Sequence, residues 1–138
     1  MGRILIGGPH GKVKDRHDDL AIKLLQENHI ITYIKNDQGS MFWELAKTPL
    51  VPWERRYNLV LYDTDLFYPG TSAEKKMEWF EIEKVYLTKT KVPVIILAET
   101  ELAARLRPLV EKADFMQIDQ PYQSDDLVRK INEIVGVK

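Results

Sequence analysis

The feature that most constrains the fold is an unbroken apolar run at residues 59–62, Leu-Val-Leu-Tyr, followed by two acids, Asp63 and Asp65. A strand without a polar face has to be covered on both sides, as in parallel sheets flanked by helices. In open sheets of this kind, ligands and reacting groups gather at the carboxyl ends of the strands. The run therefore predicts a central parallel strand, and its two acids are the first candidates for a functional site.

Further apolar runs alternate with amphipathic segments along the chain. The predicted strands cover residues 3–6, 30–34, 59–62, 92–97 and 115–118. The first predicted helix begins between residues 15 and 18, and the later ones cover 40–47, 72–88, 99–112 and 125–135. In the helix at 72–88 we expect Met77, Phe80 and Ile82 to face the core. This alternation predicts a three-layer α/β/α sandwich, and right-handed crossovers favour the flavodoxin-like strand order 2-1-3-4-5. We expect residues 1–138 to form a single domain.

The composition excludes several classes of protein. The 20 basic and 21 acidic residues leave a net charge of -1, so no overall field attracts nucleic acid or an anionic membrane. With no cysteine, disulfides, thiolate catalysis and cysteine zinc sites are impossible. No apolar segment approaches the roughly 18 residues that span a bilayer, and the first residues lack the pattern of a signal peptide. We therefore expect a cytoplasmic protein that binds neither nucleic acid nor a membrane.

The order of these segments resembles the receiver domain of bacterial response regulators, the CheY-like family. Residues 58–63 are similar to that family's third strand with its phospho-acceptor aspartate, and residues 93–97 are similar to its fourth strand. Gln120-Pro121-Tyr122 is similar to the family's Lys-Pro-Phe motif. The resemblance covers almost the whole chain. It implies a signalling module of the two-component type, with a cis peptide bond between Gln120 and Pro121.

The departures from this family fall on the residues that carry its chemistry. Gly7 and Gly8 stand where the resemblance places the acidic pair that binds magnesium. Ala98 takes the position of the hydroxyl residue, and Gln120 takes that of the lysine. Phosphoryl transfer depends on a metal and on cationic groups placed where charge develops. The resemblance therefore implies a degenerate receiver, or pseudo-receiver, that is not an enzyme, needs no cofactor and acts through protein contacts.

Two acids compete for the acceptor position. Strand length selects Asp63, whereas the spacing from Asp65 to Pro69 and Gly70 matches the family's interval. A metal-dependent phospho-acceptor that uses Asp63 or Asp65 is therefore an alternative function. Together with Asp15 from the first loop, these acids could bind Mg²⁺, because hard cations prefer several carboxylate oxygens. In the simpler interpretation, Asp15 favours a helix start and the other two are solvated loop acids.

A third function is suggested by residues 15–18, Asp-Arg-His-Asp, which resemble the Asp-x-His segment of cobalamin-binding domains. In that case the chain would bind a small ligand at the strand ends. The glycine that should follow His17 by three residues is Leu20, and the later glycine-rich signature of that family is missing. We therefore expect His17 to be a solvent-exposed loop residue.

Three aromatic residues are candidates for contact with a partner: Tyr68, Trp79 and Tyr122. Tyr122 matches the aromatic residue after the family's Lys-Pro pair, on the face that receivers commonly use for docking. The resemblance thus implies that a protein partner or a second copy of the chain binds at the fourth and fifth helical faces. The alternative for Tyr122 is a half-buried ring with its hydroxyl in water.

Overall fold

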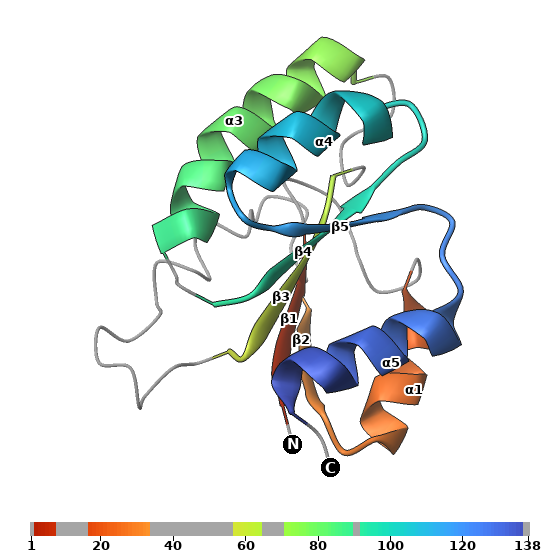
Figure 1. The fold of residues 1–138 in the computed structure, drawn as a ribbon. Coiled ribbons are helices and arrows are strands. Elements are labelled where there is room, and N and C mark those ends of the chain that lie inside the picture. The colour runs from red at the N-terminus through yellow and green to blue at the C-terminus, as the bar shows by residue number, and fades with distance from the viewer. Residues whose placement is uncertain (1, 8–16, 34–56, 65–70, 90–91, 137–138) are drawn as a thin grey trace.

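The computed structural model describes residues 2–7, 17–33, 57–64, 71–89 and 92–136. In these residues five strands alternate with four helices along the chain (Figure 1). The strands are β1 (Arg3–Gly7), β2 (Ile30–Tyr33), β3 (Leu59–Asp63), β4 (Val94–Ala98) and β5 (Met116–Asp119). The helices are α1 (Asp18–Gln26), α3 (Ala73–Lys89), α4 (Ala103–Lys112) and α5 (Ser124–Val135). None of the helices in this part of the chain is long and apolar enough to cross a membrane.

The strands form one parallel sheet in the order β2-β1-β3-β4-β5, which confirms the predicted topology. β3 lies at the centre, where Leu59 pairs with Ile4 of β1 and Val60 pairs with Val94 of β4. β5 is an edge strand, and its residues are less buried than those of β3 and β4. The carboxyl ends of all five strands therefore lie along the same edge of the sheet.

The helices cover both faces of the sheet, α1 and α5 on one side and α3 and α4 on the other (Figure 1). Successive side chains of a strand point to opposite faces. Leu59 and Leu61 accordingly pack under α1 and α5, while Val60 and Tyr62 pack under α3 and α4. Burying each such aliphatic side chain contributes about 1.5–3 kcal/mol. The unbroken apolar run is thus explained by two cores that share one strand.

α3 differs from its prediction in the residues that it turns toward the sheet. Phe80, Glu83 and Leu87 are buried, whereas Ile82 is 55% exposed, so the expected inward position of Ile82 was wrong. The buried residues follow one another at intervals of three and four, the spacing of a single helix face. The helix begins after Ser72, whose Oγ accepts a hydrogen bond from the backbone amide of Lys75 at 3.2 Å.

The remaining boundaries differ from the predictions by a few residues. α4 begins at Ala103 rather than 99, because residues 99–102 form a turn in which the Leu102 amide donates to the Glu99 carbonyl at 3.1 Å. α5 ends at Gly136, which has the left-handed backbone conformation (φ 72°) that glycine adopts most easily. The Gln120-Pro121 peptide bond is cis, as predicted. The helix predicted at residues 40–47 lies outside the described residues.

Candidate functional site: a buried carboxylate and its partners

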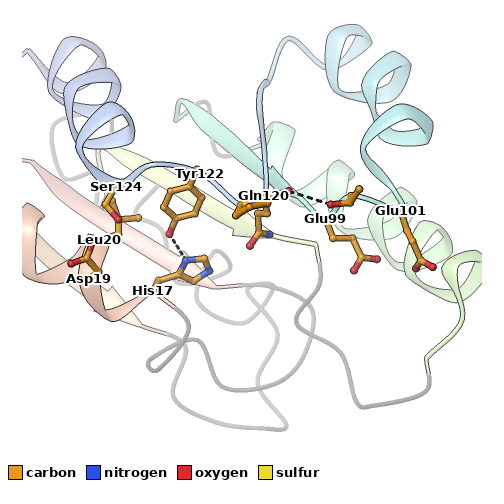
Figure 2. Close-up of a pocket in the computed structure, with 10 residues that line it drawn as sticks. His17, Asp19, Leu20, Glu99, Glu101, Gln120, Tyr122 and Ser124 are labelled. Atoms are coloured by element: carbon orange, nitrogen blue, oxygen red, sulfur yellow. Dashed lines mark hydrogen bonds between the residues drawn. The ribbon is translucent and has the colours of Figure 1, made fainter.

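Two described polar side chains at the carboxyl edge of the sheet meet at Asp63, the last residue of β3. Asp63 lies beside Leu97 of β4, and Ala98 lies beside Asp119 of β5. Two residues from outside the strands reach the same point: His17, which precedes α1, and Gln120, which follows β5. Figure 2 shows these two residues and Tyr122 side by side along one pocket.

Asp63 is completely buried, and the protein engages both of its carboxylate oxygens. Oδ2 lies 2.7 Å from Nε2 of His17, and Oδ1 accepts a hydrogen bond from Nε2 of Gln120 at 3.0 Å. The Gln120 amide also donates to the Leu97 carbonyl at 3.2 Å. A buried carboxylate is costly unless it is paired and hydrogen-bonded. His17 and Gln120 therefore make the burial of Asp63 tolerable, and the expectation of a solvated loop acid was wrong.

His17 is only 2% exposed, so the expectation of a solvent-exposed loop histidine was also wrong. Its backbone carbonyl accepts a hydrogen bond from the Ala21 amide at 2.9 Å, which places His17 at the N-cap of α1. From this position the imidazole reaches Asp63. An ionised carboxylate only accepts hydrogen bonds, so Nε2 of His17 carries the hydrogen and Nδ1 is left as an acceptor.

Tyr122 provides the donor to that second nitrogen. Its hydroxyl lies 2.5 Å from Nδ1 of His17, and the two rings are nearly parallel, at an interplanar angle of 9°. Tyr122 is half-buried, but its hydroxyl is bonded to protein rather than left only to water. Tyr122, His17 and Asp63 thus form a continuous series of hydrogen bonds, here called the Tyr-His-Asp chain.

The other candidate residues are placed less centrally. Gly7 is buried at the end of β1, and Ala98 is buried at the end of β4 with only a methyl group. Trp79 is half-buried on α3, on the face of the sheet opposite α1 (Figure 1). Four further candidates lie outside the described residues: Gly8, Asp15, Asp65 and Tyr68.

A pocket of about 550 Å³ opens beside the Tyr-His-Asp chain (Figure 2). Three carboxylates line it, Asp19, Glu99 and Glu101, and none of its described lining residues is Lys or Arg. A hydrogen bond from Ser124 lowers the pKa of Asp19 below its usual value, so this acid is ionised at neutral pH. Glu99 pairs with Lys76 at 3.0 Å on one side. The pocket therefore favours uncharged or cationic groups over anions.

Among the described residues, the donor set around Asp63 does not fit the magnesium ion that receiver chemistry requires. Mg²⁺ needs near-octahedral oxygen ligands, usually carboxylates and water. Both oxygens of Asp63 are hydrogen-bonded to side chains, and Gly7 offers no side-chain oxygen. Among the residues that the structure describes, no group of three His, Asp or Glu side chains could hold a metal ion.

A second buried acid lies on the opposite face of β3. Glu83 of α3 is 2% exposed, and its Oε1 accepts a hydrogen bond from the Tyr62 hydroxyl at 3.1 Å. Burial raises the pKa of Glu83 to about 7, although the Tyr62 hydrogen bond opposes this shift. Burial, together with the nearby Glu83 charge, holds the pKa of Tyr62 well above its usual value. The sequence did not lead us to predict this pair. Its only signal was that Glu83 follows Phe80 by three residues and so lies on the same face of the helix.

Solved structures with the same fold are response-regulator receiver domains. A receiver domain from Francisella matches with a TM-score of 0.64 at 12% identity, over 99% of this chain and 98% of that chain. A receiver protein from Burkholderia phymatum matches with a TM-score of 0.63 at 17% identity, over 100% and 98% of the two chains. The non-phosphorylated HemR receiver domain from Leptospira biflexa has a TM-score of 0.63 at 14% identity, over 100% and 97%.

Comparison by sequence adds nothing to this likeness. No protein-family model matches the sequence, and no curated protein sequence matches it. The structural matches establish that the chain has the CheY-like fold of receiver domains. At such low identity these matches carry no information about the site, because a fold alone does not determine function.

Proposed function

We propose that the chain is a receiver-type signalling module that acts through protein contacts and is not phosphorylated at Asp63 by the usual magnesium-dependent reaction. The observation that carries this proposal is the environment of Asp63, which is fully buried with one oxygen on His17 and the other on Gln120. A phospho-acceptor needs one oxygen free to attack the phosphorus atom and another to bind the metal. Neither oxygen of Asp63 is available in this arrangement.

Charge at the site supports the same proposal. Transfer of a phosphoryl group develops negative charge, which metal ions, lysine and arginine normally stabilise. Gln120 can donate a hydrogen bond but carries no charge. The neighbouring pocket is lined by the carboxylates Asp19, Glu99 and Glu101, of which Lys23 and Lys76 offset only the first two, so it does not attract an anionic phosphate donor. These groups together oppose the reaction that a working receiver performs.

Two alternative functions have less support. A metal-dependent phospho-acceptor would need to use Asp65, or to release Asp63 from His17 and Gln120. A cobalamin-type ligand would need a histidine nitrogen that is available to a metal. Both ring nitrogens of His17 are hydrogen-bonded, one to Asp63 and one to Tyr122.

The phosphorylation test uses the full chain with Mg²⁺ and either acetyl phosphate or beryllofluoride. We expect no saturable change in tryptophan fluorescence and no phosphoryl adduct in the intact mass, because Asp63 has no free oxygen. Asp119→Asn, at the exposed end of the edge strand β5, is the matched control for Asp63→Asn. A saturable response that disappears in Asp63→Asn and persists in Asp119→Asn would overturn the proposal.

The surface proposed for protein contact consists of α4, the edge strand β5 and α5. An edge strand presents unpaired backbone groups that another chain can use. Charged side chains flank it, with Arg107 bonded to Asp119 at 3.1 Å and Arg129 exposed on α5. This surface suits a second copy of the chain or another protein with complementary charge.

We expect Arg107→Glu to weaken any self-association about tenfold or more, because it places like charges beside Asp119. Lys75→Glu makes the same charge change on α3, outside this surface, and should have no effect. Sedimentation velocity over a range of concentrations measures both variants against the parent chain. Equal effects of the two substitutions would exclude this surface, and a parent chain that stays monomeric would leave only a different protein as its partner.

A further inference from the structure

The Tyr-His-Asp chain has the layout of a nucleophile, a base and an orienting acid. In hydrolytic triads a buried carboxylate holds a histidine in one tautomer, and the other ring nitrogen accepts the proton of a hydroxyl nucleophile. Here Asp63 lies 2.7 Å from Nε2 of His17, and Nδ1 lies 2.5 Å from the Tyr122 hydroxyl. Such arrangements are recognised by geometry and role rather than by sequence position.

Burial decreases along the Tyr-His-Asp chain from Asp63 to Tyr122. Asp63 is completely buried and His17 is 2% exposed, while Tyr122 is half-buried. Tyr122 and His17 both line the pocket of about 550 Å³ (Figure 2). Tyr122 therefore borders a space that admits a small molecule, while Asp63 is shielded from water.

We propose that Tyr122 is a nucleophile that accepts an acyl group, with His17 as its general base and Asp63 as a positioning residue. The Tyr122 oxygen attacks the carbonyl carbon of an activated acyl donor, and the bond from that carbon to the leaving group breaks. The hydroxyl proton moves to Nδ1 of His17 and from there to the leaving group. The product is an acyl ester on Tyr122.

The charge of the pocket limits the donors that this site accepts. The described lining contains carboxylates and no Lys or Arg, and although Lys23 and Lys76 pair with Asp19 and Glu99 from outside it, the lining offers no cation to an acyl phosphate, which is therefore a poor donor. Uncharged or cationic esters, thioesters and acyl imidazoles fit the lining. The proposal does not rest on the signalling role, and its failure would leave that role untouched.

The test exposes the full chain to N-acetylimidazole, an uncharged acyl donor, and measures the acetylation rate of each of the six tyrosines by peptide mass spectrometry. A positioned general base contributes roughly 10²–10⁴-fold to such reactions. We expect Tyr122 to react at least about tenfold faster than N-acetyltyrosine amide in the same solution. A tyrosine that is merely exposed, without a positioned base, would react at the rate of the free derivative.

Variants separate the roles of the three residues. His17→Gln should reduce the rate at Tyr122 to that of the free tyrosine derivative, and Asp63→Asn should reduce it about tenfold or more. Asp114→Asn, at an exposed position between α4 and β5, is the control and should leave the rate unchanged. If the site variants do not fold, the ratio of the acetylation rates of Tyr122 in the parent chain and of the free derivative still tests the proposal. A Tyr122 that reacts no faster than the free derivative would overturn the proposal.

Discussion

His17→Leu is expected to lower the free energy of unfolding by about 3 kcal/mol or more, because the buried Asp63 carboxylate loses one of its hydrogen-bond donors. In this variant Oδ2 of the fully buried Asp63 loses the imidazole nitrogen that lies 2.7 Å away. The gap left by the ring adds a smaller packing cost. Urea denaturation of the variant and the parent chain at neutral pH measures the difference.

The double variant His17→Leu/Asp63→Leu provides the control for this effect. Replacing a whole buried pair by apolar residues is often neutral or stabilising, so the double variant should recover much of the lost stability. Asp18→Asn, at an exposed position next to His17, should change the free energy by less than about 0.5 kcal/mol. A loss below about 1 kcal/mol in His17→Leu would show that the buried pair contributes little to the fold.

Stability is expected to fall by about 3 kcal/mol between pH 4.5 and pH 8 through the titration of Glu83 alone. Burial raises the pKa of Glu83 from 4.5 to about 7 in the folded state. Between these values the folded chain holds a proton that the unfolded chain has released, so raising the pH favours unfolding. At 1.36 kcal/mol for each pH unit between the two pKa values, the total is about 3 kcal/mol.

Glu83→Gln isolates this contribution, because the amide keeps the shape of the side chain and an acceptor for the Tyr62 hydroxyl. The variant should be more stable than the parent chain at pH 8 and should lose the downward slope above pH 4.5. Glu78→Gln, exposed on the same helix, should retain the slope of the parent chain. Urea denaturation across this pH range provides the measurement, and parallel pH curves for Glu83→Gln and its parent would refute the prediction.

The fold could be predicted because its two determinants are local and repeat along the chain. Residues 59–62 have no polar side, which requires cover on both faces, and the alternation of strands with helices then leaves few topologies. Boundaries were less predictable. Glu99 is polar and precedes a helical pattern, yet residues 99–102 form a turn before α4 begins.

The site was only partly predictable, because its contacts join residues far apart in the sequence. Gln120 was expected near Asp63 through the family resemblance, and its amide does donate to that carboxylate. His17 was missed, because a histidine among helix-start acids has the pattern of a solvated surface. Glu83 was missed for the opposite reason, since a charged residue is rarely expected on the buried stripe of a helix.

Tyr62 and Asp63 are consecutive residues of β3 whose side chains enter opposite cores. One binds Glu83 beneath α3, and the other binds His17 at the start of α1. The Asp63 charge already contributes to the raised pKa of Tyr62, so the two polar pairs sense each other across one peptide unit. A rotation of that single unit would loosen both pairs together. The two helical layers are therefore connected by polar contacts to consecutive residues of one strand, in addition to their apolar packing against the sheet.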